Sequence, residues 1–376
     1  VAAYGHLQRE HGLELVTAPA TAAQLPNLLP IPGAVRAHLD VGAQLFAQIL
    51  GVESAGINLL RSGFMPSFEG IIADQNVRYA LVDARAFTGA SAPLVHDVYA
   101  PLHTPNRGLA VVAPDEHSLQ QPYSRSRKYH AHYRDCSTHP RLTTDARSTG
   151  VGISRYGGDG GSERYEPEVA RNMIRQQAED YVSGRLRHGL GLSASMERDP
   201  LMVVDFDLMT MVANWQEAPE FIAHVVDTMT VTAGIQAITV GSYLEESNEN
   251  QAVWPGPVID ASPADQYADW RLPRLYAAAR QFQAVAHQRA ESDTQRRRLT
   301  QALRELFMAY SLPSTGPMVP ELNRDQIERM RDHINSAMTL VEDLSASQRT
   351  DDVFLSQREA ETPIFSQLDT ITLLQP

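Results

Sequence analysis

The chain has 376 residues, enough for two or three domains, and its hydrophobic fraction of 43% and charged fraction of 20% are those of an ordinary globular protein. No stretch approaches the continuous apolar run of a transmembrane helix, and residues 1–20 lack the basic-then-apolar order of a signal peptide. The formal net charge of −13 repels nucleic acid from most of the surface, so any such binding requires a local basic patch.

Two residue types are nearly missing, and this excludes several kinds of site. Lys128 is the only lysine, and its neighbours match no Walker A loop, kinase lysine or Schiff-base lysine. Cys136 is the only cysteine, which excludes an intrachain disulfide and cysteine-based zinc or iron–sulfur sites. This favours an intracellular or particle-borne protein. Because the sequence begins with Val1, we expect a processed or partial chain.

The first third of the chain changes from an arm to a helix and then to strands. Residues 1–33 predict an extended arm, because prolines between 19 and 32 forbid a continued helix. Residues 35–50 have apolar side chains at helical spacing and predict the first long helix. Short strands are then predicted at 77–82, 94–99 and 109–112.

The middle of the chain alternates between loops, helices and strands. Residues 114–165 are polar and loop-rich, and Pro167 then stands where the first turn of an amphipathic helix would begin. Buried strands are predicted at 201–206 and 235–243, with one or two helices between them, broken near Pro219.

The last third is predicted to be mostly helical, with helices at 275–290, at 294–310 and after Asn323, and a second arm at 350–376. The fold class is therefore α+β (mixed): an irregular mixed α/β body, a helical C-terminal region and extended N- and C-terminal arms. The predicted domains are an N-terminal arm at 1–33, a mixed α/β body at 34–262, a helical region at 263–347 and a C-terminal arm at 348–376.

One segment is both basic and aromatic. Arginines neutralise phosphates and tyrosines stack on unpaired bases, so the segment is a candidate nucleic-acid contact. The residues assigned to this contact are Tyr123, Arg125, Arg127, Lys128, Tyr129 and Arg134. The alternative is a solvated surface loop on an acidic protein, because charge density alone is a weak marker.

The same segment offers a metal-binding pattern. His130 and His132 would point to one face of a strand, and such a pair can bind a metal ion. Asp205 and Asp207 follow an apolar run and would also share a face, so a divalent ion is conceivable there. Polar loop residues and a helix cap are the competing interpretations of the two patterns. The glycine-rich run at 157–161 matches no nucleotide-binding motif.

Two arms, a mixed body and no legible active site favour a structural self-assembly protein. The prediction is a viral capsid subunit that forms an icosahedral particle around a nucleic-acid genome, without a cofactor. Its partners would be copies of itself, bound through the terminal arms, and packaged nucleic acid, but no membrane. Its location would be the virion, and the host cytoplasm during assembly.

Two alternatives remain open. One is a metal-dependent hydrolase or transferase that uses His130 and His132 with Asp205 or Asp207. The other is a regulatory module that binds a partner through helices at 272–345. Assembly into large particles, firmly bound metal or a stable metal-free monomer would distinguish the three hypotheses.

Overall fold

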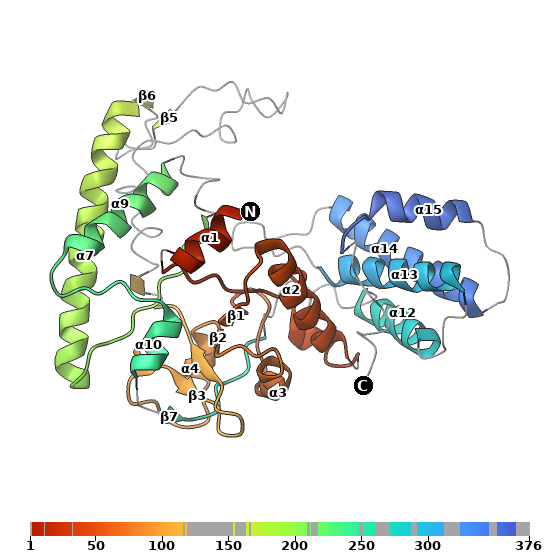
Figure 1. The fold of residues 1–376 in the computed structure, drawn as a ribbon, viewed down its shortest axis with the longest axis horizontal. Helices are drawn as coiled ribbons and strands as arrows, with labels where there is room; N and C mark the ends of the chain where they lie inside the picture. Colours follow the sequence, from red (N-terminus) through yellow and green to blue (C-terminus); the bar gives the residue numbers. More distant parts are fainter. Residues whose placement is uncertain are drawn as a thin grey trace. The chain divides into compact units, whose positions relative to one another are not determined.

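The protein is described as a computed structural model, which covers residues 2–10, 12–31, 33–115, 117–118, 153–154, 163–164, 167–208, 211, 217–247, 251–259, 271–286, 292–311, 324–345 and 352–365 (Figure 1). The helices are α1 (Ala2–Glu10), η1 (Leu25–Leu28), α2 (Ala34–Leu50), η2 (Pro66–Phe68), α3 (Glu69–Ala73), α4 (Arg85–Thr88), η3 (Asp97–Tyr99), α7 (Pro167–Met196), α9 (Ala218–Val231), α10 (Val240–Glu246), α12 (Arg271–Ala286), α13 (Asp293–Tyr310), α14 (Arg324–Ser345) and α15 (Asp352–Glu361). The strands are β1 (Gly56–Asn58), β2 (Tyr79–Leu81), β3 (Leu102–His103), β4 (Ala110–Val112), β5 (Ile153–Ser154), β6 (Glu163–Arg164) and β7 (Gln251–Ala252). This mixture of helices and strands agrees with the predicted α+β class.

The chain divides into two compact units, which we describe separately. Unit 1 comprises residues 1–94, 102–112 and 244–376, and unit 2 comprises residues 95–101 and 113–243. Within the described residues, no helix combines the length and the apolar character needed to cross a membrane.

Unit 1 contains a sheet with the strand order β1-β2-β4-β3-β7. Strands β1, β2 and β4 are parallel, β3 runs antiparallel to β4, and β7 runs parallel to β3. Ile57, Ala80 and Val111 are fully buried in the three parallel strands, which explains why these strands are short apolar runs. The first residue of β1, Gly56, has no room for a side chain, because a Cβ at this position would lie 2.4 Å from the ring of Tyr79.

The N-terminal segment packs on the body of its own chain. Leu25, Leu28 and Ile31 are at most 3% exposed. The amide of Leu25 donates to the Ser62 carbonyl at 2.7 Å, and Thr17 forms a parallel bridge with Ile57. The apolar residues of the predicted arm therefore have an intramolecular surface to bury against.

Four helices, α12, α13, α14 and α15, form the C-terminal part of unit 1, and α13 contacts the other three (Figure 1). Helix α13 begins with a capping box, in which Ser292 and Gln295 each bond the backbone of the other. The side chain of Glu305, in the middle of α13, is fully buried. The helices must therefore supply polar partners for a charged group in their interior.

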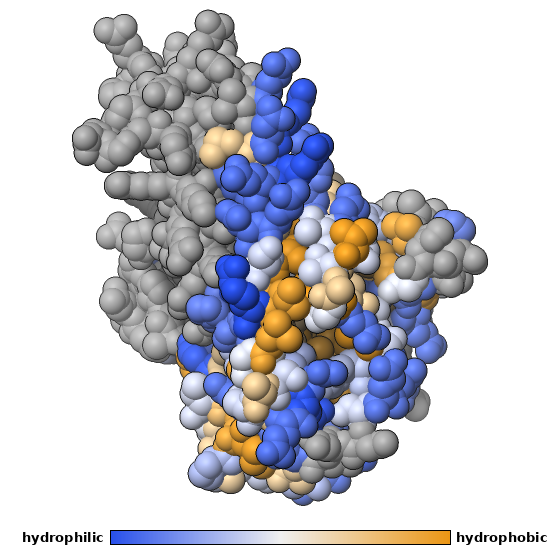
Figure 2. Space-filling model, turned by 90° about the vertical axis from the view of Figure 1, so that its left-hand side faces the viewer, coloured by the Kyte–Doolittle hydropathy of each residue, from blue (hydrophilic) through white to orange (hydrophobic). Residues whose placement is uncertain are grey.

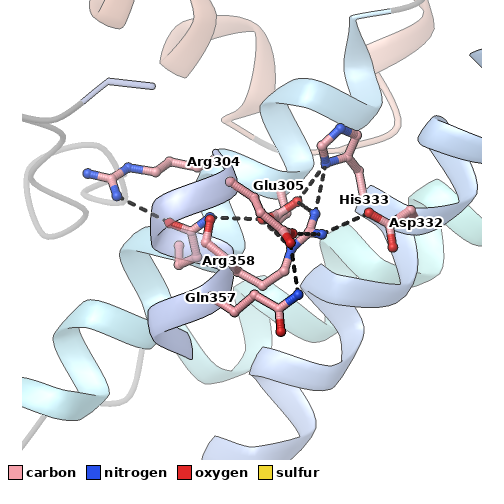
Figure 3. Close-up of polar contacts among 8 residues, drawn as sticks. Arg304, Glu305, Asp332, His333, Gln357 and Arg358 are labelled. Atoms are coloured by element: carbon pink, nitrogen blue, oxygen red, sulfur yellow. Dashed lines mark hydrogen bonds and ion pairs between the residues drawn. The ribbon is translucent and has the colours of Figure 1, made fainter. Parts of the chain in front are cut away.

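Those partners come from three helices (Figure 3). Arg358 of α15 donates to Glu305 through Nε at 3.0 Å and Nη2 at 2.7 Å. The Nδ1 atom of His333 on α14 lies 2.6 Å from Glu305, and Gln301 donates to it at 2.8 Å. Although burial raises the pKa of Glu305, the hydrogen bonds from His333, Arg358 and Gln301 outweigh it and lower that pKa below its usual value.

A buried histidine joins α2 to α13. The His38 ring lies 4.4 Å from the Phe307 ring and 5.4 Å from the Tyr310 ring, between centroids. Its Nδ1 atom is 2.9 Å from the Ala34 carbonyl and its Nε2 atom is 3.2 Å from the Thr21 hydroxyl. Burial lowers the pKa of His38 from 6.5 to about 4, and the hydrogen bond to Ala34 opposes this only in part.

This shift predicts a pH-dependent stability. Between pH 6.5 and 4 the unfolded chain protonates His38 and the folded chain does not, so the free energy of unfolding falls as the pH is lowered. A lowering of the pKa from 6.5 to about 4 corresponds to a loss of ~3 kcal/mol once the pH is below both values. Urea unfolding at pH 7 and pH 4 measures this loss of unfolding free energy. The His38→Gln variant is expected to lose less stability over this interval than the wild type. An equal loss in the two proteins would contradict the assignment.

Unit 2 is built on two packed helices. Ile174, Ala178, Tyr181 and Val182 of α7 pack against Phe221 and Val225 of α9 in one buried cluster. The rings of Tyr181, Phe206 and Phe221 meet with centroids 5.9–6.3 Å apart. Figure 2 shows apolar residues that interrupt a largely hydrophilic surface. In unit 2, Leu190, Val226 and Val231 are more than half exposed.

Several predicted elements are confirmed. The helix at 35–50 is α2, the helix from Pro167 is α7, and the strands at 77–82 and 109–112 contain β2 and β4. The helix expected to break near Pro219 begins there as α9, with proline in its first turn. The helices predicted at 275–290, at 294–310 and after Asn323 correspond to α12, α13 and α14.

Other predicted elements are wrong. Residues 235–239 form no strand, because Thr239 accepts a hydrogen bond from the Ser242 amide and starts helix α10. The strand at 94–99 is replaced by η3, in which Asp97 has a left-handed φ of 47°. Residues 201–206 contribute only a bridge at Val203, and the extended tail is a helix at α15, where Leu355 is 1% exposed.

Candidate functional site

Three segments of unit 2 lie side by side and form the frame of a polar site. The amide of Leu201 donates to the Tyr99 carbonyl at 2.9 Å, and the amide of Asp115 donates to the Val203 carbonyl at 2.8 Å. Val203 and Pro114 form a parallel bridge. In the sequence, Asp115 lies three residues after the end of strand β4. In α/β enzymes, the positions just after parallel strands commonly carry the functional side chains.

The carboxylate of Asp115 is the centre of this site. It is almost completely buried and accepts hydrogen bonds from four groups. Tyr99 donates its hydroxyl to Oδ1 at 3.2 Å and the His117 amide donates to the same atom at 3.0 Å. The Ser118 hydroxyl and Arg185 Nη1 donate to Oδ2, the latter at 3.4 Å. A carboxylate with this many donors is held in one orientation.

Arg185 comes from the middle of α7 and is also buried, with 6% of its side chain exposed. Its Nη1 atom donates to Asp115 and to Ser118 Oγ, and its guanidinium lies 5.5 Å from the Tyr181 ring centre. Among the residues that the structure describes, its Nε and Nη2 atoms have no hydrogen-bond acceptor. Two buried nitrogen atoms of a cation, with three N–H groups and no acceptor among the described residues, suit an oxygen-bearing ligand at this point.

Two histidines lie next to the carboxylate. His188 Nε2 is 3.0 Å from the Tyr99 hydroxyl, and the rings of His117 and His188 are 4.8 Å apart. A Tyr99 that donates to Asp115 must accept from a protonated Nε2 of His188, because the phenol has one hydrogen. Burial lowers the pKa of His188, which is therefore neutral at pH 7, and burial together with the Asp115 charge raises the pKa of Tyr99. The three side chains therefore form one hydrogen-bonded chain, in which His188 donates to Tyr99 and Tyr99 donates to Asp115.

Two further carboxyl groups stand on the neighbouring segment. Asp205 and Asp207 follow Val203 at alternating positions and are half-buried. Val203 bridges Pro114, so the two segments run in the same direction from the bridge towards Asp205 and Asp115. Unit 2 therefore brings three aspartates onto two neighbouring segments, together with a buried arginine.

Only some of the site residues predicted from the sequence lie in the described part of the chain. The basic–aromatic residues Tyr123, Arg125, Arg127, Lys128, Tyr129 and Arg134, the pair His130 and His132, and the glycine-rich run all lie outside the described residues. Asp205 and Asp207 are described, and the structure places them beside the segment of Asp115. In the described part of the chain, no three His, Cys, Asp or Glu side chains are grouped as a metal site would require.

The sequence interpretation missed Tyr99, Asp115, His117, Ser118, Arg185 and His188. One signal was available, since an apolar run at 109–113 ends in Pro114-Asp115 and is followed by His117-Ser118. Polar residues directly after a buried parallel strand are a recognised position for a site. Arg185 carried no signal, because it lies 70 residues from Asp115 in the chain and within a helix rich in arginine.

Comparisons with known proteins give two family matches. A model of glycosyl hydrolase family 57 matches residues 2–139, and a model of the C-terminal region of 1,4-α-glucan branching enzyme matches residues 274–372. Neither match alone spans half of the chain. A search of curated proteins finds no significant match.

Solved structures match nearly the whole chain. The α-amylase AmyC from Thermotoga maritima has a TM-score of 0.87 and 22% identity, over 99% of this chain and 75% of that one. A family 57 branching enzyme from the archaeon Thermococcus kodakaraensis has a TM-score of 0.83 and 18% identity, over 99% and 74%. The family 57-type branching enzyme from Pyrococcus horikoshii has a TM-score of 0.81 and 18% identity, over 99% and 73%.

These findings overturn the capsid hypothesis. The predictions of a viral shell subunit, of a structural protein instead of an enzyme, and of a virion location are wrong. Both family matches and all three structures are of glycoside-processing enzymes, and the three structures come from cellular microbes. The terminal segments that suggested shell assembly instead pack on their own chain or form helix α15. This chain has the fold of the amylase and branching-enzyme structures, and its two ends match the glycosyl hydrolase and branching-enzyme models.

Proposed function

We propose that the chain acts on α-glucans and cleaves or transfers their glycosidic bonds. The observation that carries this proposal is the order of the two family matches: glycosyl hydrolase family 57 at the N-terminal end and branching enzyme at the C-terminal end of one chain. The fold supports it, since an α-amylase and two branching enzymes superpose on 99% of the chain. Fold alone would not suffice, because one fold hosts many functions.

Glycosidic bond chemistry needs carboxyl groups rather than a cofactor. One carboxylic acid protonates the leaving oxygen, and a second carboxylate attacks the sugar or activates water. We assign these roles to Asp205 and Asp207, the half-buried aspartates of unit 2. Asp115 is already occupied by four donors, so its role is to hold Arg185 in place.

Arg185 would bind the substrate in this scheme. Its Nε and Nη2 atoms are buried and lack acceptors among the described residues, and glucan hydroxyl and ring oxygens are acceptors of the required kind. Tyr99 and His188 continue the hydrogen-bonded chain from Asp115 and fix the orientation of its carboxylate beside Arg185.

The test uses isosteric variants. In Asp205→Asn and Asp207→Asn, the release of reducing ends from amylose is expected to fall by about 100-fold or more, because each variant removes a group that transfers a proton or attacks the sugar. Asp227→Asn, on the exposed face of α9, is the matched control and keeps full activity. Binding is followed in parallel by electrophoresis through gels that contain glycogen. Full activity in both variants would contradict the assigned roles, and an inactive wild type that also fails to bind would contradict the proposed function.

A further inference from the structure

Helix α15 docks on its neighbours through a narrow stripe of side chains. Leu355 is 1% exposed, Arg358 is 7% exposed, and Thr362, which follows the helix, is 5% exposed. The other α15 side chains that the structure describes are exposed or half-buried, and Val353 is 68% exposed. Because a single leucine supplies the buried apolar surface of this helix, its position depends largely on polar contacts.

The groove between α13 and α14 receives the arginine of this stripe (Figure 3). Arg358 donates to Glu305 of α13 at 2.7 and 3.0 Å and to Asp332 of α14 at 2.9 Å. Glu305 is fully buried. If α15 leaves, this carboxylate keeps His333 and Gln301 as its donors among the described residues. An empty groove is therefore unfavourable, and the groove selects a helix that brings a guanidinium to this point.

A second anchor follows the helix. The Phe365 ring lies 5.4 Å from the Phe307 ring of α13, between centroids, and the Phe365 carbonyl accepts Arg304 Nη2 at 3.3 Å. The backbone of Phe365 has a left-handed φ of 50°, which a bulky residue adopts only where contacts hold it. Residues 352–365 therefore dock as one segment, with two anchor points on α13.

The docking segment is joined to α14 by a short connection. Helix α14 ends at Ser345 and α15 begins at Asp352, so residues 346–351 link them. The contacts of Arg358 and Phe365 all lie beyond this connection, and a second copy of the chain carries the same segment and the same groove. Short connections of this kind invite the exchange of a terminal element between copies.

We propose that two copies of the chain exchange residues 352–365, so that α15 of each copy docks in the α13–α14 groove of the other. The exchanged contacts are those of the single chain, so the exchange costs little. Reciprocal exchange fills both grooves and closes the assembly as a twofold dimer, whose population rises with protein concentration. This inference does not depend on the proposed action on glucans.

Two charge-reversed full-length variants test the exchange. In Glu305→Arg and in Arg358→Glu, like charges meet when α15 docks on its own chain, which disfavours that docking. In an equal mixture, the unaltered Arg358 of the first variant can dock on the unaltered Glu305 of the second. The variants are refolded separately and together, and light scattering after size exclusion measures their masses. We expect about tenfold more dimer in the mixture than in either variant alone. Circular dichroism checks that each variant is folded, and an equal dimer fraction in the three samples overturns the proposal.

A cross-linking experiment leaves the buried pair intact, and it decides the question if a charge-reversed variant does not fold. Arg297 of α13 and Glu359 of α15 form a partly exposed ion pair at 2.5 Å. Arg297→Cys and Glu359→Cys are made on separate chains, both with Cys136→Ser, and the chains are refolded together and treated with a bismaleimide. We expect a cross-link between the two chains, with a yield that rises about tenfold between about 10 and 100 µM protein.

Two controls make the cross-linking result decisive. Each variant alone gives the background, because the exchanged cysteines are then not opposite each other. The double variant Arg297→Cys/Glu359→Cys in one chain shows that the reagent spans the pair. With that control positive, a yield between chains no higher than the background overturns the proposal.

Discussion

Asp115→Asn is expected to destabilise the protein by about 3–5 kcal/mol, which is the usual result of removing one partner from a buried ion pair. The variant keeps the shape of the side chain but removes its charge. Arg185, with 6% of its side chain exposed, would then be a buried cation with no carboxylate beside it. Urea unfolding at pH 7 measures the loss, and Asp199→Asn, an exposed aspartate of unit 2, should change stability by no more than about 0.5 kcal/mol.

The same variant separates a positioning role from a purely structural one. If Asp115 only stabilises the fold, Asp115→Asn assayed well below its unfolding temperature has normal kinetics. If it holds Arg185 for the substrate, the KM for amylose rises while kcat changes less, because a contact present before and during the reaction is lost. Arg185→Met is expected to show the same rise in KM. A normal KM in both variants would remove Arg185 from the binding site.

Arg358→Met is expected to destabilise the C-terminal helices by about 3–5 kcal/mol for a related reason. Glu305 is fully buried and receives two hydrogen bonds from Arg358, so the variant leaves a buried carboxylate with His333 and Gln301 only (Figure 3). The double variant Glu305→Gln/Arg358→Met carries no unpaired buried charge and should recover part of the loss.

The control for this prediction is an exposed pair in the same helices. Arg297 forms an ion pair with Glu359, but 44% of the Arg297 side chain is exposed, so Arg297→Met should cost at most about 1 kcal/mol. Equal losses in Arg358→Met and Arg297→Met, or no recovery in the double variant, would show that the Glu305–Arg358 pair does not hold the helices together. The native pair also predicts acid sensitivity, because a carboxyl whose pKa is lowered by folding loses its contribution to stability as the pH falls through that pKa.

The long helices could be predicted because their signals are local. Helix α2 has apolar residues at helical spacing, and helix α7 has a proline at its start, so neighbouring residues were sufficient. The same reasoning failed at 235–243 and in the tail. In the tail, Arg358 pairs with Glu305, which lies 53 positions away in the chain and could not be read from neighbouring residues. At 235–243 the signal was local but was missed, because the Thr239 hydroxyl accepts the Ser242 amide at the start of a helix.

The function could not be predicted because glycosidic chemistry has a faint sequence signal. It uses two carboxyl groups and no lysine, cysteine or metal, so the exclusions based on Lys128 and Cys136 did not bear on it. With 45 acidic residues in the chain, composition cannot single out the pair that acts. The DxD pattern at Asp205 and Asp207 suggested either a divalent-ion site or a helix cap, and neither interpretation pointed to Asp115, whose segment is placed beside it only by the fold.

The proposal that this protein rearranges α-glucans is tested most directly by the bonds themselves. Amylose is incubated with the full chain, and its anomeric protons are followed by NMR, with Asp207→Asn as the control. The account predicts that signals of new reducing ends or of α-1,6 branch points grow with the wild type and grow about 100-fold more slowly with the variant. An unchanged spectrum with the wild type, under conditions where the protein is folded and binds amylose, would contradict the account.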